Sequence, residues 1–295
     1  MGTMQATKKR IQELRQQYDV LKKAKVSLLN MIDESELHEH VYNSNAIENS
    51  TLSLSETEKI LLELHVSRNV SIREVFEAKN LARVMDYIEK KSKESEVTPE
   101  LILFLHKMLI TGINDNIAGR FRQKNEYVKV GTHIAPAPEH LEQMIDAAIE
   151  RFHTDVDEYF LDKVARFHLE FETIHPFNDG NGRIGRVLIN YQLLRFGFPT
   201  VIIPYKDRKT YYESFSKYRS SAKSVDGMSD ILFLSLCESL HKRIAYLKGE
   251  QIILLTDYAK KHGTPANGLL NKAKRQTTPA FREKGIWKIG SSYNE

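Results

Sequence analysis

The chain has 295 residues, 41% of them hydrophobic and 28% charged, with a formal net charge of +4. This length fits one large domain plus a small one, and the composition is that of a soluble globular protein rather than a disordered or fibrous one. The single cysteine, Cys237, excludes a disulfide within the chain, and no apolar run approaches the ~20 residues of a membrane span. The N-terminus is rich in Lys and Arg and lacks the apolar core of a secretory signal, so we expect a cytoplasmic protein without membrane contact.

Helical patterns dominate the chain. We expect disorder over residues 1–7, one long amphipathic helix over residues 8–31, and a second helix capped by Asp33 or Ser35. A later helix is expected to begin at Leu54 with Ser55 and Glu58 in capping-box spacing. Including that one, further helices are expected over residues 54–66, 71–90, 98–109, 139–153, 159–174, 187–196, 207–218 and 229–247.

One segment has the pattern of a strand instead. Residues 126–131 read Glu-Tyr-Val-Lys-Val-Gly, in which polar and apolar side chains alternate, and Pro136 and Pro138 follow. Alternation next to turn residues predicts a short β-hairpin.

A short segment between two helical patterns carries the chemistry. From His175 to Arg186 the sequence reads His-Pro-Phe-Asn-Asp-Gly-Asn-Gly-Arg-Ile-Gly-Arg. Gly180 and Gly182 allow a tight turn whose amides converge at the N-terminus of the following helix. Unpaired N–H groups and the helix dipole favour an anion there, so the segment predicts a phosphate site.

The other side chains of this segment support the same interpretation. Arg183 and Arg186 lie three residues apart on similar faces of the helix, where both can hold phosphate oxygens. A bare phosphate would be repelled by Asp179, which makes sense as the ligand of a divalent metal. His175 can remove a proton near neutral pH. We predict a nucleotide-phosphate site with its own base; the alternative is a plain helix connection with a hydrogen-bonded histidine and surface arginines.

This segment resembles the signature of the Fic family, H-P-F-x-[D/E]-G-N-G-R-x-x-R, and matches it at every specified position. The resemblance implies an all-α fold, a Fic-type helical bundle with a short β-hairpin flap. It also implies transfer of AMP from ATP to a Ser, Thr or Tyr hydroxyl of a target protein, with Mg²⁺ held by Asp179 and with His175 as the base. The ATP phosphates are then expected at Asp179, Gly180, Asn181, Gly182, Arg183 and Arg186.

A second motif lies upstream, near residues 42–50. Ser44, Glu48 and Asn49 match [S/T]-x-x-x-E-[G/N], which resembles the inhibitory helix motif of the family in its N-terminally inhibited class. In the family this glutamate pairs with the last arginine of the signature, here Arg186, and blocks the place of the ATP γ-phosphate. In some relatives it also supports removal of AMP. The alternative is a solvated glutamate at a helix end.

The predicted hairpin resembles the flap of the family, through Gly-Arg-Phe-Arg followed by Val-x-Val-Gly. Such a flap holds the target peptide by strand addition, and the alternative is an ordinary surface hairpin. The nucleotide contacts of the flap are carried over to Val128, Lys129, Val130 and Gly131.

An aromatic pair is expected at the adenine ring. The resemblance assigns this place to Tyr211 and Tyr212, which lie in the predicted helix over residues 207–218. Some relatives place an asparagine seven residues after the second tyrosine, where this chain has Arg219. The polar closure of the adenosine site is therefore left open.

The C-terminal part changes character. A capped helix over residues 256–263, a second helix over 264–275, and a turn and strand over 280–290 resemble a winged helix of the excisionase type. Eight basic and three acidic residues over 256–295 give this part a net charge of +5, which leaves −1 for the rest. Concentrated positive charge indicates a nucleic-acid partner such as DNA; the alternative is an accessory module that packs on the core or docks a protein.

We therefore predict an N-terminal helical region over residues 1–95, a Fic catalytic core over 96–250 and a winged-helix-like module over 251–295. The predicted function is an autoinhibited protein adenylyltransferase. Its alternatives are a nucleotide-sensing DNA-binding regulator and a hydrolase that removes AMP at the same site. Transfer of UMP or a phosphoryl group ranks lower, because a phosphoryl-transferring relative departs from the signature at the second glycine, here Gly182. The N-terminal helix is a candidate surface for a homodimer.

Overall fold

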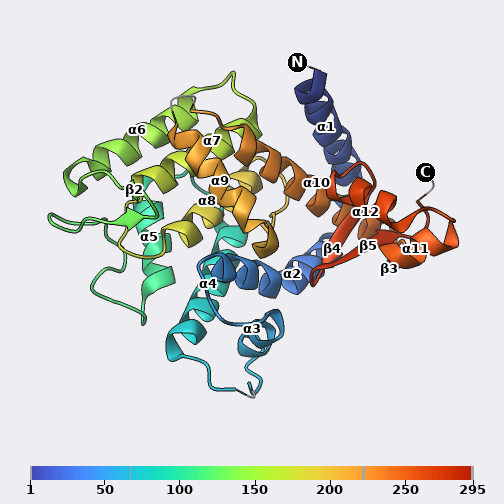
Figure 1. Ribbon diagram of the computed structural model, residues 1–295, viewed down its shortest axis with the longest axis horizontal. Helices are drawn as coiled ribbons and strands as arrows, with labels where there is room; N and C mark the ends of the chain where they lie inside the picture. The colour runs from blue at the N-terminus through green and yellow to red at the C-terminus, as the bar shows by residue number, and fades with distance from the viewer. Residues whose placement is uncertain (1, 67, 221–222, 294–295) are drawn as a thin grey trace. The chain divides into compact units, whose positions relative to one another are not determined.

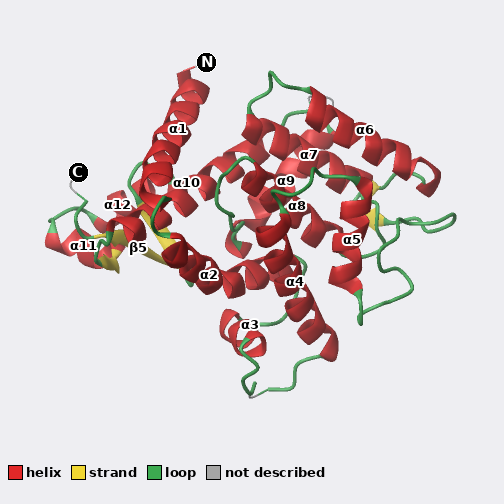
Figure 2. Ribbon diagram, turned by 180° about the vertical axis from the view of Figure 1, so that it is seen from behind, coloured by secondary structure: helices red, strands yellow, loops and turns green. Residues whose placement is uncertain are grey.

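The computed structural model describes residues 2–66, 68–220 and 223–293. Helices make up most of these residues, and in this part of the chain Figure 2 shows strands only in one hairpin and in one small sheet. The predicted all-α class with a short hairpin is confirmed. No helix among the described residues is both long enough and apolar enough to span a membrane.

The chain groups into two compact units. Helices α2 (Val26–Ile47) and α10 (Asp226–Lys248) contribute residues to both. The predicted division at residues 95 and 250 stays a prediction. The larger unit consists of Leu37–Phe198 and Ile203–Asp230, and the smaller unit of Met1–Glu36, Pro199–Ile202 and Ile231–Glu295.

A buried helix, α8 (Asn181–Arg195), lies at the centre of the larger unit. Helices α4, α5 and α7 pack against it, and it is buried at Asn181 and from Arg183 to Leu193 (Figure 1). Its apolar residues and its polar residues Arg183, Arg186 and Asn190 are all buried, so protein surrounds this helix on every side. The loop before α8 is therefore attached to a fixed support. The other helices of this unit are α3 (Leu54–Leu61), α4 (Ile72–Lys91), α5 (Pro99–Ile110), α6 (Leu141–Thr154), α7 (Phe160–Ile174) and α9 (Arg208–Arg219).

Side-chain caps explain several helix starts. Thr98 caps α5 and Ser71 caps α4, at the places that the sequence predicts. The capping box of α3 is formed by Ser53 and Glu56, two residues before the predicted pair. Because both bonds of the box involve Ser53, α3 begins at Leu54 as predicted, but it ends at Leu61 rather than near residue 66.

The N-terminal helices differ from the prediction. Helix α1 (Gly2–Lys22) occupies most of the segment expected to be disordered, and Met1 lies outside the described residues. The helix expected over residues 8–31 is two helices, because the chain turns between Lys22 and Val26. At the turn, the Lys25 ammonium donates to the backbone oxygen of Leu247. This bond joins residues more than two hundred positions apart, so a periodicity pattern could not show it.

The smaller unit ends in a three-stranded antiparallel sheet with order β3-β5-β4. Two helices lie between its first and second strands in the sequence, and their apolar sides meet the sheet at a small core that includes Leu255, Tyr258, Leu269 and Ile289. The two helices predicted over residues 256–263 and 264–275 are present. The turn and strand predicted over residues 280–290 are a hairpin of two strands. Strand β3 was not predicted. The elements are β3 (Ile252–Leu254), α11 (Leu255–Lys261), α12 (Ala266–Lys274), β4 (Ala280–Glu283) and β5 (Ile286–Gly290).

The hairpin of the larger unit is shorter than the sequence predicts. Strand β1 (Lys129–Val130) pairs with β2 (His133–Ile134) in antiparallel register, so residues 126–128 are not part of the strand. The turn between them includes Gly131 with φ of 60°, a conformation that glycine adopts without strain.

Candidate active site

The loop between α7 and α8 is tight and uses left-handed backbone conformations at both ends. His175 follows α7 with φ of 51°, and Gly180 precedes α8 with φ of 83°. The left-handed conformation favours glycine at position 180, and a Cβ there would meet Leu109 at 3.1 Å and Ile110 at 3.2 Å, which leaves it little room. The first amides of α8 then lie at the N-terminus of a buried helix, where an anion is favoured.

Three buried side chains fix the shape of this loop. The Asn181 amide accepts from Phe177 N at 2.8 Å and donates to Phe177 O at 2.7 Å. His106 stacks on the Phe177 ring with a centroid distance of 3.6 Å. Gly119 N donates to Nδ1 of His106 at 3.0 Å, so Nε2 carries the proton and donates to the Asp179 backbone oxygen, also at 3.0 Å. The sequence predicts His106 only as a core or boundary histidine, and the structure makes it a support of the loop.

Arg122 also supports the loop, and sequence reasoning missed this role. Its Nε donates to the backbone oxygen of His175 at 2.9 Å, and its Nη2 donates to that of Pro136 at 3.0 Å. Its backbone N–H donates to Pro176 O at 2.9 Å. The position of His175 is thereby tied to the residues that flank the hairpin.

His175 is a neutral base in this environment. Its side chain is mostly buried, and burial lowers its pKa to about 4. Burial, together with the charge of Glu48, raises the pKa of Glu172 to about 8. The two side chains approach to 3.7 Å between Nδ1 and Oε2, but near pH 7 both are uncharged, so the contact is not an ion pair. An imidazole that is unprotonated at neutral pH can accept a proton from a hydroxyl.

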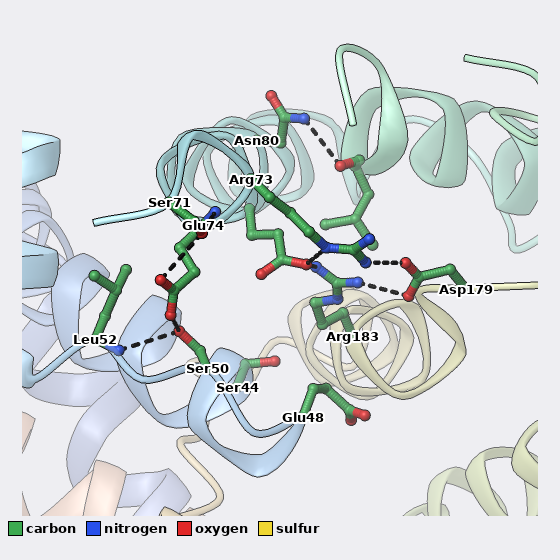
Figure 3. Close-up of polar contacts among 12 residues, drawn as sticks. Ser44, Glu48, Ser50, Leu52, Ser71, Arg73, Glu74, Asn80, Asp179 and Arg183 are labelled. Carbon is green, nitrogen blue, oxygen red and sulfur yellow. Dashed lines mark hydrogen bonds and ion pairs between the residues drawn. The ribbon is translucent and has the colours of Figure 1, made fainter. Parts of the chain in front are cut away.

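Asp179 belongs to a closed ring of four charged side chains (Figure 3). Its Oδ1 accepts from Arg183 at 2.9 Å and its Oδ2 accepts from Arg73 of α4. Oε1 of Glu77 accepts from Arg73 at 3.0 Å and lies 3.2 Å from Arg183. Although burial raises the pKa of Asp179, the two arginines hold it below its usual range. Asp179 is therefore ionised at neutral pH.

The donor set at Asp179 fits one particular kind of metal site. Among the described residues, no group of three or more His, Cys, Asp or Glu side chains could hold a metal ion by itself. One ionised carboxylate beside an anion site is what Mg²⁺ uses when phosphates and waters complete its octahedral shell. The residues present thus fit Mg²⁺ bound together with a nucleotide and do not fit a protein-only metal cage.

Arg186 is buried and its donors are already occupied. Nη2 donates to Glu48 Oε1 at 2.8 Å and to the Ser44 backbone oxygen at 2.8 Å, and Nε donates to Ser44 Oγ at 2.9 Å. Nη1 donates to the Tyr211 hydroxyl at 3.2 Å. The side chain of Arg186 is 7% exposed and that of Glu48 is 36% exposed. The structure therefore brings together the residues that the two sequence motifs single out.

The backbone at the end of α2 explains why the glutamate is followed by an asparagine. Asn49 has φ of 68°, Ser50 N donates to Asn45 O at 3.0 Å, and Asn49 N donates to Ala46 O at 3.0 Å. These bonds form a Schellman motif in which Glu48 is the C-cap and Asn49 takes the left-handed position. Only glycine and asparagine adopt that position readily, so the motif fixes the direction of Glu48.

The segment after Glu48 is held in turn by α4. Oε1 of Glu74 accepts from Thr51 N at 2.7 Å and from Thr51 Oγ1 at 2.9 Å. It also accepts from Ser50 Oγ at 3.2 Å (Figure 3). Glu74 is the residue next to Arg73, so the first turn of α4 contacts both the Glu48 segment and Asp179.

The carboxylate of Glu48 lies over the first turn of α8. A Cβ placed on Gly182 would come within 2.1 Å of Glu48 Oε1. This is the position in which an anion is favoured by the helix N-terminus. Glu48 therefore occupies the position that favours an anion, and Arg186 is its charged donor.

The two tyrosines have different surroundings. Tyr211 is buried, and its hydroxyl bonds His168 Nε2 at 2.8 Å as well as Arg186. Tyr212 is exposed, and its hydroxyl donates to Ile47 O at 2.8 Å. Arg219 is half-buried beside the backbone oxygen of Glu172. Tyr211 thus supports Arg186 through its hydroxyl, and the side chain of Tyr212 is the more accessible of the two.

The hairpin is anchored close to the loop. His133 Nε2 bonds the backbone oxygen of Thr173 at 2.9 Å, two residues before His175. Of the four residues predicted to contact a nucleotide, Val128 and Val130 are half-buried and Lys129 and Gly131 are exposed. Their nucleotide contacts remain a prediction.

The buried histidines of this unit predict a loss of stability in acid. Burial lowers the pKa of His106 and His175 to about 4 and that of His168 to about 3. Between about pH 6.5 and pH 4 the unfolded chain binds protons that the folded chain does not, so stability is full above this range and falls as the pH falls. Above about pH 4.5, Glu172 has the opposite effect on stability, because its pKa is higher in the folded chain than in the unfolded chain. It is one group, whereas three histidines lower stability in acid.

We expect the melting temperature of the chain to fall by at least about 5 °C between pH 7 and pH 5. A pKa that differs by one between the folded and the unfolded chain is worth about 1.4 kcal/mol, and each kcal/mol corresponds to about 2–4 °C. Differential scanning calorimetry across this range measures the change. Constant or rising stability would show that these histidines are not held neutral.

Comparison with known proteins agrees with this geometry. The family model described as Fic/DOC family matches residues 96–193. A curated relative from Nematostella vectensis, "Protein adenylyltransferase Fic", is 34% identical over 203 residues, which is 68% of this chain and 46% of the relative. "Protein adenylyltransferase fic-1" of Caenorhabditis elegans is 34% identical over 180 residues, 59% of this chain and 35% of the relative. The chain thus spans less than half the length of these relatives.

A solved structure is similar as well. The crystal structure of a Fic-domain-containing signalling protein from Bacteroides thetaiotaomicron superposes with a TM-score of 0.73 at 24% identity. The match covers 82% of this chain and 98% of that protein. At this identity the likeness concerns the fold.

Proposed function

This chain belongs to the Fic/DOC family through residues 96–193, and we propose that it is a protein adenylyltransferase that transfers AMP from ATP to a hydroxyl side chain of a target protein. One observation supports the proposal most directly. A neutral His175 lies beside a helix N-terminus that favours an anion, and two buried arginines, Arg183 and Arg186, lie in the first turns of that helix. This set can bind a triphosphate and accept a proton beside it.

The ATP phosphates lie on the first amides of α8, from Gly180 to Arg183. Asp179 would hold Mg²⁺, which neutralises phosphate charge when bound. The hydroxyl oxygen of the target attacks the α-phosphorus, the bond to the bridging oxygen of pyrophosphate breaks, and the hydroxyl proton moves to His175. Arg183 stabilises the charge that develops on the phosphate oxygens. Tyr211 and Tyr212 border the adenine ring, and the β1–β2 hairpin presents the target Ser, Thr or Tyr.

In this proposal the chain is autoinhibited as the structure describes it. Arg186 is the donor for the γ-phosphate, and Glu48 occupies it. Two anions cannot share the same donors over Gly182, so ATP binds productively only when Glu48 moves away.

Labelling with ATP tests the proposal. The Glu48→Gly variant is incubated with a cell lysate and ATP labelled either at the α-phosphate or at the γ-phosphate. We expect protein labelling from α-labelled ATP alone. Labelling from the γ position would indicate phosphoryl transfer instead, preference for UTP would indicate transfer of UMP, and loss of pre-attached AMP without net labelling would indicate a hydrolase.

A second candidate function rests on α12. The exposed residues Asn267, Asn271 and Lys274 of α12 fall on one side of the helix at steps of three, four and seven, and the exposed Arg275 is its C-cap. Asn, Lys and Arg are side chains that contact bases and phosphates. The smaller unit would then bind DNA, and the nucleotide site would act as a sensor. An ATP-dependent change in DNA affinity without any protein labelling would favour this candidate.

A further inference from the structure

We propose that Arg73 occupies the cation position at Asp179 and must leave it before Mg²⁺ binds, so that the site carries a second, metal-side block besides Glu48. The inference rests on the proposed function, because it concerns the metal that accompanies ATP. It assigns a role to a residue outside both sequence motifs.

The first step of the argument is that both oxygens of Asp179 are in use. Arg183 takes Oδ1 at 2.9 Å and Arg73 takes Oδ2 (Figure 3). A magnesium ion needs a carboxylate oxygen at about 2.0–2.1 Å with near-octahedral access around it. A guanidinium on that oxygen excludes the ion by space and also by charge, since both are cations.

The second step is that the two arginines are not equivalent. The Arg183 side chain is 3% exposed and lies on the buried helix α8, whereas the Arg73 side chain is 56% exposed and lies on the first turn of α4. Arg183 has no room to leave, but Arg73 can rotate into water at little cost, because exposed ion pairs contribute at most about 1 kcal/mol. Mg²⁺ therefore displaces Arg73 from Asp179, and Arg183 stays in place.

The third step is that Arg73 has an ion-pair partner both before and after Mg²⁺ binds at Asp179. Its Nε already bonds Glu77 Oε1 at 3.0 Å, four residues along the same helix. After Mg²⁺ replaces it at Asp179, Arg73 keeps this bond. The metal thus competes with one displaceable ion pair, and its apparent affinity is reduced by the strength of that pair.

Binding of ATP to the full chain tests the inference without any turnover. The background is the double variant Glu48→Gly with His175→Ala, in which ATP can enter and is not consumed. Isothermal titration calorimetry compares this background with versions that also carry Arg73→Ala, Arg73→Lys or Arg151→Ala, each in excess Mg²⁺ and in EDTA. Arg151 is the matched control, because it is 52% exposed and pairs with Glu170 away from the loop.

We expect Arg73→Ala to bind ATP about fivefold more tightly in excess Mg²⁺ and no more tightly in EDTA. Loss of a positive charge alone would weaken binding of an anion, so tighter binding specific to Mg²⁺ identifies the competition. Arg73→Lys should shift the affinity less, and Arg151→Ala should leave it unchanged.

Unchanged or weaker binding of Arg73→Ala in Mg²⁺, with ATP still bound by the background, overturns the inference and leaves the adenylyltransferase proposal intact. If the background itself binds no ATP, the proposed function fails and the inference falls with it. The two failures are therefore distinguishable in one experiment.

Discussion

Replacing His175 with alanine is expected to reduce AMP transfer at least about 10²-fold while leaving ATP binding within about twofold. General bases contribute roughly 10²–10⁴-fold, and the imidazoles of His106 and His168 are engaged with Asp179 O and the Tyr211 hydroxyl. The measurement is incorporation of label from α-labelled ATP, made in the Glu48→Gly background, together with calorimetric ATP binding.

His153→Ala is a suitable control for this prediction. His153 lies in α6, has a partly exposed side chain and bonds Val97 O, so its loss removes an imidazole without touching the loop. Transfer by His153→Ala should equal that of the background. Undiminished labelling by His175→Ala would show that His175 is not the base. Loss of ATP binding would instead show that His175 supports the loop.

The tight loop between two helices was predictable because several of its contacts are local. Asn181 closes its loop on Phe177, four residues away, and Arg183 reaches Asp179 over the same separation. The chain sequence contains both partners of such bonds side by side. The glycines and the asparagine at position 49 are readable for the same reason, since a left-handed conformation is a property of one residue.

The supports of the site were not predictable, because their partners are distant in the sequence. Arg122 is 53 residues from His175, His106 is 73 from Asp179, and Arg73 is 106 from Asp179. No spacing rule connects such pairs. An arginine on an amphipathic helix looks the same in sequence whether it faces water or a carboxylate from a distant part of the chain.

Distant contacts also explain where the predicted helices and strands differ from the structure. The long N-terminal periodicity predicts one helix, but a bond from Lys25 to Leu247 accompanies a turn between α1 and α2. Strand β3 is three residues long and pairs with β5 through residues near position 289. Its apolar run is too short to distinguish from a loop until the partner strand is in place.

Replacing Glu48 with glycine is expected to raise AMP transfer at least about tenfold. The carboxylate lies over Gly182 and holds Arg186, which is the donor for the γ-phosphate in the proposed function. A competing charge-assisted bond of about 1.5–3 kcal/mol corresponds to roughly ten- to a hundredfold in ATP affinity. Glycine also tolerates the C-cap geometry that Asn49 follows, so α2 should keep its end. Label from α-labelled ATP measures the transfer, and calorimetry measures the affinity.

Two companion variants separate charge from shape in this prediction. Glu48→Gln keeps the volume and a weaker bond to Arg186, so its transfer rate should lie between wild type and Glu48→Gly. Ser44→Ala removes an acceptor of Arg186 and keeps the carboxylate, so the anion site stays occupied and transfer should stay near the wild-type rate. If all three variants transfer AMP at the wild-type rate and bind ATP as tightly as wild type, the Glu48–Arg186 pair is only a structural contact. It would then not block the anion site.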